Sequence, residues 1–205
     1  MKAFLIVDMQ NDFMPGGPLA VPGGDKIIFL INSLTSRFSL VIASQDWHPE
    51  DHMSFACVHP GKKVAEVVKI QGEDQILWPV HCVQNSEGAK IVSGIDPSKI
   101  DKVILKGSDR WIDGYSAFFD HQRRKSTGLA DYLTEKKVDT LYLAGVATDY
   151  CIFYSALDAL DLGFNVFVIQ DACRGLDLKK GDGKRALQLL KEKGAHLITS
   201  DEIPN

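Results

Sequence analysis

Residues 141–160 read LYLAGVATDYCIFYSALDAL, an apolar run that passes through a glycine into a helical pattern. The apolar run is typical of a buried strand, and the apolar residues after it recur at the spacing of an amphipathic helix. Gly145 provides the tight turn between the two elements. Cys151 falls in the first turn of the expected helix, so the segment places a thiol just beyond the end of a strand.

The same alternation of short apolar runs and helical patterns recurs along the chain. It is typical of a parallel sheet whose two faces are both covered by helices. We therefore predict a three-layer α/β fold with a mostly parallel, six-stranded sheet. The expected strands are residues 3–8, 40–46, 102–106, 140–145, 165–171 and 196–199, and the expected helices lie near 24–37, 127–137, 149–162 and 182–193.

The length of the chain favours one domain. Its 205 residues, of which 45% are hydrophobic, suffice for one sizeable core and are too few for two ordinary domains. We predict a single domain over residues 1–205. Residues 47–100 are rich in Gly, Pro, His and Asp and weak in periodicity, which indicates a loop-rich excursion over the sheet edge. Long ordered loops in compact domains are usually functional.

Charge, hydropathy and cysteine usage exclude several classes of protein. The net charge is -4, and the only compact basic run is Arg123 to Lys125, so we expect no nucleic-acid partner. No apolar stretch approaches the ~20 residues of a membrane span, and the start of the chain turns acidic too early for a signal peptide. Four cysteines without a CxxC pair fit free thiols in a reducing compartment. We expect a cytoplasmic protein that binds no membrane, and a homo-oligomer is compatible with the sequence.

Several polar residues stand at the ends of the expected strands. Ligands of open parallel sheets bind beyond the carboxyl ends of the strands, so these residues are candidates for a site. The chain lacks GxGxxG, and GDGKR at 181–185 lacks the other residues of a phosphate loop, so nucleotide binding is not expected. The candidates at the strand ends are Asp8, Asp46, Lys106, Gly145 and Asp171.

Cys151, Asp8 and Lys106 together could form a cysteine hydrolase. A helix start lowers the pKa of a thiol and offers N–H groups to an oxyanion. Asp8 could take the thiol proton, and Lys106 could stabilise the thiolate. Burial would raise the pKa of Asp8, while Lys106 would oppose that rise. Each residue alone has an ordinary alternative, as a small buried hydrophobe, a loop-capping carboxylate or a solvated lysine.

A second group of residues could bind a divalent metal. Asp46 and His48 stand two apart at a strand end and therefore point to the same side, and His81 follows in WPVHC. Two histidines and one carboxylate form a plausible metal site with open positions, although His81 could instead be a hydrogen-bonded core residue. His52 is a further candidate. The remaining histidines lack carboxylates at useful spacing, and we interpret His59, His121 and His196 as ordinary.

These motifs resemble those of the isochorismatase-like cysteine hydrolases, most closely the nicotinamidases, along nearly the whole chain. VDMQNDF alone indicates only the superfamily, whereas WPxHC and DWHPxxHxSF favour nicotinamidases. The motifs that carry the resemblance are VDMQNDF with Asp8, SQDWHPEDHMSF with Asp46 and His48, WPVHC with His81, LKGSD with Lys106, DGYSAFFD with Tyr115 and AGVATDYC with Cys151.

The resemblance implies a fold, a reaction and a set of site residues. The fold would be that of the isochorismatase-like hydrolases, with a cis peptide between Val146 and Ala147. Some relatives add a fourth side chain to the metal, but the spacing around His52 differs and we leave it out. The implied groups are a catalytic triad of Asp8, Lys106 and Cys151, an oxyanion hole of the Ala147 and Cys151 N–H groups, and one divalent ion, nominally zinc with iron or manganese as alternatives, on Asp46, His48 and His81.

The implied reaction converts nicotinamide and water to nicotinate and ammonia through a thioester, in NAD salvage. Phe13, Trp78 and Tyr115 are expected to wall a flat aromatic slot. Two alternatives remain open. Another amidohydrolase of the superfamily would not need the aromatic wall and the metal. A non-catalytic metal-binding or redox-sensing module would use Cys151 as an oxidisable thiol, but would not need Asp8 and Lys106.

Overall fold

The computed structural model describes residues 1–203 and contains a six-stranded sheet. The strand order is β5-β2-β1-β6-β7-β8, and every neighbouring pair is parallel. All six predicted strands are present, which confirms the predicted fold class. The strands are β1 (Lys2–Val7), β2 (Val41–Asp46), β5 (Lys102–Lys106), β6 (Thr140–Val146), β7 (Asn165–Arg174) and β8 (His196–Ile198).

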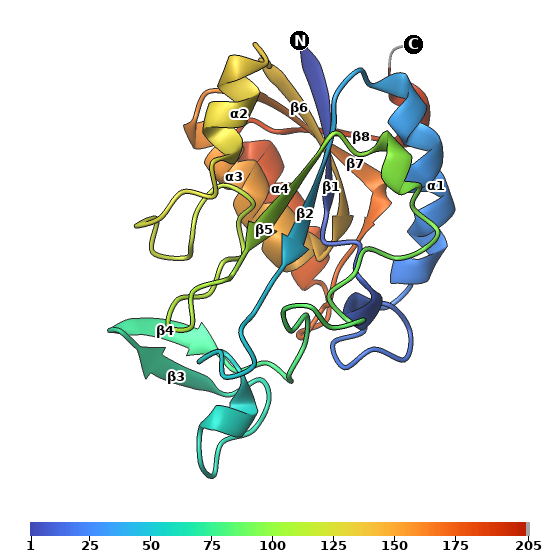
Figure 1. Ribbon diagram of the computed structural model, residues 1–205. Helices are drawn as coiled ribbons and strands as arrows, with labels where there is room; N and C mark the ends of the chain where they lie inside the picture. The colour runs from blue at the N-terminus through green and yellow to red at the C-terminus, as the bar shows by residue number, and fades with distance from the viewer. Residues whose placement is uncertain (204–205) are drawn as a thin grey trace.

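Helices cover both faces of this sheet, as predicted (Figure 1). Side chains alternate along a strand, so Leu5 of β1 faces one layer and Phe4 faces the other. Leu5 packs in the core with α2 (Leu129–Glu135), α3 (Phe153–Asp161) and α4 (Asp182–Glu192), and Phe4 packs in the core with α1 (Ile28–Leu34). Among the described residues, no helix is both long and apolar enough to cross a membrane.

Two predicted helices differ from the observed ones. The helix expected near 24–37 is α1 flanked by two 3-10 turns, Gly24–Ile27 and Thr35–Arg37. The helix expected from 149 begins as a π-helical turn, Thr148–Ile152, in which the Ile152 N–H donates to the Ala147 carbonyl at 3.1 Å. Cys151 therefore lies in this wider turn before α3, and not in the first turn of the α-helix.

The excursion between β2 and β5 contains a small sheet that the sequence did not predict. β3 (Val67–Ile70) and β4 (Glu73–Ile76) pair antiparallel and project below the main sheet in Figure 1. Gln71 and Gly72 join them with φ angles of 53° and 91°, the backbone of a tight two-residue hairpin turn. The strands are short and largely exposed, so hydrophobic periodicity does not predict them. Gln-Gly also differs from Asn-Gly, the usual sequence signal for such a turn.

The topology brings distant segments to one edge of the sheet. β1 lies between β2 and β6, so the chain leaves β1 toward one side of the sheet and later returns to its other side. Parallel strands end at the same edge, and such a reversal point is where open α/β sheets bind ligands. Gly145 lies within β6 and not in the predicted turn, and a Cβ there would lie 2.0 Å from the Val7 carbonyl oxygen. The ends of β1, β2, β5 and β6 therefore converge on one site.

Candidate active site

Lys106 lies at the centre of a buried polar cluster at the strand ends. Its Nζ is 2.8 Å from Asp8 Oδ2 and 2.5 Å from Asp46 Oδ1. It also donates to the Gly114 carbonyl at 2.9 Å and lies 3.4 Å from Cys151 Sγ. The predicted triad residues Asp8, Lys106 and Cys151 are thus brought together, and each is at most 6% exposed.

Asp8 is held at the end of β1 by a local turn and by one neighbouring strand. Its φ of 50° turns the chain sharply after Val7, and Ser44 Oγ of β2 donates to Asp8 Oδ1 at 2.7 Å. The Oδ2 contact with Lys106 is an ion pair rather than an aligned hydrogen bond. A carboxylate oxygen of Asp8 and Cys151 Sγ lie within 4.8 Å of each other, near enough for proton exchange after a small movement.

Burial dominates the proton affinities of the triad. Burial raises the pKa of Asp8, and the opposing charge of Lys106 only partly offsets that rise, as expected from the sequence. Burial alone would lower the pKa of Lys106, but Asp46 and Asp8 outweigh it and keep the amine charged. The pKa of Cys151 is raised by burial despite Lys106. The lowered thiol pKa expected at a helix start is therefore not found, and the thiol needs a base to take its proton.

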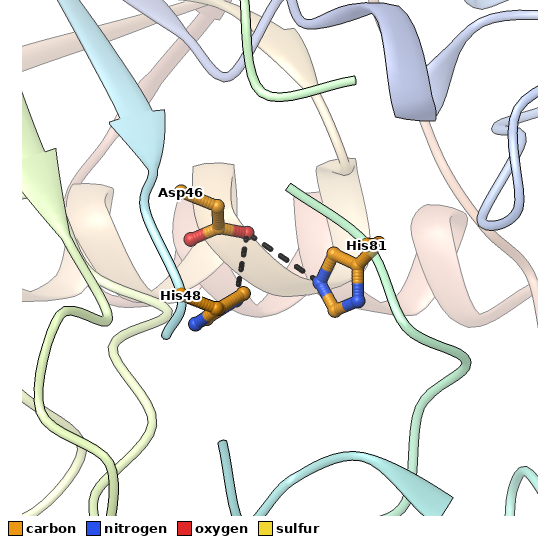
Figure 2. A group of neighbouring side chains, drawn as sticks. All are labelled: Asp46, His48 and His81. Atoms are coloured by element: carbon orange, nitrogen blue, oxygen red, sulfur yellow. Dashed lines mark ion pairs between the residues drawn. The ribbon is translucent and has the colours of Figure 1, made fainter. Parts of the chain in front are cut away.

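Asp46, His48 and His81 converge beside this cluster (Figure 2). Asp46 Oδ2 lies 3.8 Å from His48 Nε2 and 3.9 Å from His81 Nε2. The Nδ1 atom of each imidazole is hydrogen-bonded to a backbone carbonyl, that of Gly107 for His48 and that of Pro79 for His81, both at 2.8 Å.

This donor set fits a divalent metal. Burial lowers the pKa of His48 to about 3 and that of His81 to about 4, so both imidazoles are neutral near pH 7. Their Nδ1 contacts leave each Nε2 facing the Asp46 carboxylate, which is the arrangement of histidine ligands held by outer hydrogen bonds. The predicted metal residues are thus assembled, and a divalent ion is supported by their chemistry.

Gln10 and Asp113 belong to the site but were not identified from the sequence. Gln10 Nε2 donates to the Asp46 carbonyl, and the Asp46 N–H donates to Gln10 Oε1, both at 2.8 Å. Asp113 accepts from the Gly114 N–H at 2.8 Å, and its carboxylate lies within 4.8 Å of nitrogens on His48 and His52. Both residues sit inside motifs quoted above, VDMQNDF and DGYSAFFD, but neither residue type signals such a role alone.

His52 and Asp171 take other positions. His52 Nδ1 is 2.7 Å from Ser54 Oγ, and its ring lies against His48 with centroids 4.4 Å apart, so it borders the Asp46, His48 and His81 group. Asp171 lies within β7 and accepts from the Ser200 N–H and hydroxyl at 2.9 and 2.6 Å. Asp171 thus anchors the Ser200 turn and does not join the cluster.

A small cavity opens beside Cys151, and the three predicted wall residues all line it. Trp78 Nε1 donates to the Tyr115 hydroxyl at 3.1 Å, which fixes two of these rings against each other. Ala147 and Cys151, the two expected oxyanion residues, also line the cavity, and the Val146–Ala147 peptide is cis as the resemblance implied. The sequence did not identify four of the lining residues, Leu19, Asp113, Tyr150 and Leu176.

A family model, related sequences and solved structures all match this chain over nearly its whole length. The isochorismatase domain family model matches residues 2–202. The nicotinamidase of Escherichia coli is 46% identical over 202 residues, covering 97% of this chain and 94% of that protein. The structure of an Acinetobacter baumanii nicotinamidase/pyrazinamidase aligns with a TM-score of 0.95 at 42% identity, covering 98% of this chain and 97% of that one.

A further solved structure bears on the metal residues. The pyrazinamidase of Pyrococcus horikoshii in complex with zinc aligns with a TM-score of 0.79 at 38% identity, covering 97% of this chain and 98% of that one. These similarities extend over the whole sheet and confirm the resemblance drawn from the sequence motifs. The strand-end cluster, the fold and the full-length matches together establish that this chain belongs to the isochorismatase domain family.

Proposed function

We propose that the protein hydrolyses nicotinamide to nicotinate and ammonia, with Cys151 as the nucleophile. The observation that carries the proposal is the position of Lys106 Nζ, which contacts Asp8, Asp46 and Cys151. Asp46 and Cys151 in turn line an aromatic cavity. The nicotinamidases of similar sequence support the choice of substrate. A buried thiol, a buried carboxylate of raised pKa and a fixed cation are the parts that amide cleavage requires.

The reaction begins with attack of Cys151 Sγ on the carboxamide carbon while Asp8 takes the thiol proton. The N–H groups of Ala147 and Cys151 stabilise the oxyanion that forms. Asp8 then gives its proton to the departing ammonia, and a thioester remains. Water, deprotonated by Asp8, attacks the thioester and releases nicotinate, and the proton returns to the thiol. Lys106 remains charged throughout and limits the rise in the pKa of Asp8.

Asp46, His48 and His81 would hold one divalent ion, with zinc as the nominal choice. The zinc complex of the similar pyrazinamidase supports zinc, but iron and manganese are alternatives because this donor set does not select among them. When bound, the ion supplies a Lewis-acidic position for the lone pair of a ring nitrogen. The side chains of Phe13, Trp78 and Tyr115 would hold the flat ring in register with Cys151.

The cellular setting follows as a further proposal. The four cysteines are free thiols in the structure, and Cys57 is exposed, which supports a reducing, cytoplasmic compartment. Nicotinate production would place the reaction in NAD salvage. The substrate is a small molecule, and we propose neither a nucleic-acid nor a membrane partner; a homo-oligomer is compatible with the chain.

Ammonia release from nicotinamide and from benzamide, with and without a chelator, tests the proposal. Benzamide keeps the scissile amide but replaces the ring nitrogen with C–H. We expect metal-loaded protein to prefer nicotinamide by about 100-fold or more, because an unpaired polar partner discriminates strongly. His81→Ala or metal removal should reduce both the preference and the activity. Equal rates on the two amides, or full activity without metal by elemental analysis, would contradict the assigned recognition.

A further inference from the structure

A large cavity on the described part of the chain lies apart from the catalytic cluster. It has a volume of about 570 Å³, within the range of small-molecule sites. It lies between the β3-β4 hairpin, the π-helical turn and α4. Apolar side chains form much of its surface, including Val67 and Ile76 of the hairpin, Phe153 of α3 and Leu189 of α4. Four charged residues also line it: Asp149, Lys179, Asp182 and Arg185. We refer to this cavity as the outer groove.

Tyr150 lies between the outer groove and the small cavity beside Cys151. Within residues 1–203, it is the one residue that lines both. Its ring meets Trp78 edge-on with centroids 5.0 Å apart and lies 5.6 Å from the ring of Tyr115. Tyr150 therefore borders both spaces, and it directly precedes the candidate nucleophile.

We propose that Tyr150 is a specificity-determining residue that restricts the site to single-ring carboxamides by closing it toward the outer groove. This inference rests on the proposed function. Trp78 and Tyr115 are linked by a hydrogen bond and form the fixed part of the wall, whereas Tyr150 meets them through ring contacts. Shortening Tyr150 joins the two spaces, and the apolar groove then accepts an aryl group carried by the substrate ring.

The position of that aryl group follows from the chemistry of the substrate. In the proposed function, a pyridine ring would be held by its nitrogen at the metal residues and by its carboxamide, on ring position 3, at Cys151. Ring position 5 is meta to both anchored atoms, so a substituent there points away from the metal and from the thiol. The matching probe is 5-phenylnicotinamide, whose apolar phenyl group suits the apolar side chains of the groove.

The experiment compares kcat/KM for nicotinamide and 5-phenylnicotinamide in Tyr150→Ala, Tyr150→Leu and Tyr150→Phe. We expect kcat/KM for 5-phenylnicotinamide, divided by that for nicotinamide, to rise about tenfold or more in the Ala and Leu variants. The same ratio should stay at the wild-type value in Tyr150→Phe. Leu189→Ala is the matched control, because it widens the groove away from the catalytic cavity. Phe13→Ala enlarges the catalytic cavity without bordering the groove, and should not produce this gain.

The affinities for nicotinate and 5-phenylnicotinate, measured by calorimetry, give the same comparison without turnover. They can therefore also be compared in variants that bind but do not react. An unchanged ratio in Tyr150→Ala by both measurements, or an equal gain in Leu189→Ala or Phe13→Ala, would overturn the inference. If Tyr150→Ala does not fold, Tyr150→Leu decides on the same criteria. If the wild-type protein releases no ammonia from nicotinamide, the proposed function is wrong. The ratio of the two binding affinities still tests the role of Tyr150 in that case.

Discussion

Asp46 couples the candidate metal centre to the candidate nucleophile through its two carboxylate oxygens. One oxygen contacts Lys106, and the other faces His48 and His81. Lys106 in turn contacts Asp8 and lies beside the thiol. A change at any of these side chains therefore alters the charge balance of both centres, and variants at Lys106 or Asp46 do not isolate one role.

Cys151→Ala isolates the nucleophile, because it removes the reacting atom and leaves the surrounding charges in place. We expect kcat/KM for nicotinamide to fall by about 10⁴-fold or more. The side chain is small, so the thermal unfolding midpoint should move by only a few degrees. Ammonia release and a melting curve on the same preparation check both expectations. A folded variant that keeps substantial activity would remove Cys151 from the mechanism.

Ser44→Ala should shift the acid limb of the pH profile upward. The Ser44 hydroxyl donates to Asp8 Oδ1 and lowers the pKa of that carboxyl, against the rise caused by burial. Asp8 must be ionised to act as a base, so activity is present above its pKa and is lost as the pH falls through it. Loss of one hydrogen bond to a charged group, worth about 1.5 kcal/mol, moves the acid midpoint up by about one pH unit. A profile of kcat/KM with an unmoved acid limb would contradict this role.

The close contact between β1 and β6 requires a residue without a side chain at position 145. Gly145 has a φ of 130°, and a Cβ there would meet the Val7 carbonyl oxygen at 2.0 Å. We expect Gly145→Ala to lower the free energy of unfolding by about 3 kcal/mol, measured by urea denaturation. Gly163→Ala is the control, because Gly163 also has a positive φ, 87°, but no heavy atom lies within 4 Å of its built Cβ. Its cost should be about 1 kcal/mol.

The loop after β1 holds the end of β2 through the Gln10 amide. Two hydrogen bonds join this amide to the backbone of Asp46, so Gln10 sets where the carboxylate stands. We expect Gln10→Ala to weaken zinc affinity by about 10- to 100-fold, measured by competition with a chelating dye. Gln45→Ala is the matched control, since Gln45 and Gln10 both donate to the Ala89 carbonyl. Equal losses in the two variants would assign the effect to the Ala89 loop.

The sequence predicted the elements whose signal is local and missed those that depend on tertiary contacts. Runs such as AFLIVD and TLYLAG are buried on both faces, so their apolar content alone identified the central strands. The β3-β4 hairpin is exposed and irregular in pattern, and its turn residues, Gln71 and Gly72, carry little signal. The π-helical turn at Cys151 leaves the apolar pattern of the following helix unchanged, so periodicity could not reveal it.

The residues of the candidate site also fall into those that a local signal predicts and those that depend on tertiary contacts. Asp8, Asp46 and Lys106 stand directly at strand ends, and a parallel sheet brings such positions to one edge. Gln10 and Tyr150 contact partners far away in sequence, the backbone of Asp46 on β2 and the ring of Trp78. No spacing rule links those partners, so only the folded arrangement identifies them.

The metal should stabilise the molecule as a whole, because its ligands are assembled only in the folded state. Asp46 ends β2 and His48 follows it, whereas His81 lies beyond the β3-β4 hairpin. An ion at about 100 times its Kd adds about 2.7 kcal/mol, or about 5 to 10 °C in Tm for a chain of this size. Calorimetric scans with zinc and with chelator measure the shift. Cys151→Ala should keep it and His81→Ala should lose it; the reverse pattern would move the ion to another site.

The central position of β1 has a consequence for the order in which the molecule can be assembled during translation. β1 ends at Val7, but β6, one of its two neighbours, begins only at Thr140. A nascent chain that has emerged as far as β5 can pair β1 with β2, yet the other edge of β1 stays open and the thiol has not been made. The open backbone edge of β1 and its apolar side chains are therefore unprotected while most of the polypeptide is synthesised, and that interval is where a chaperone would act.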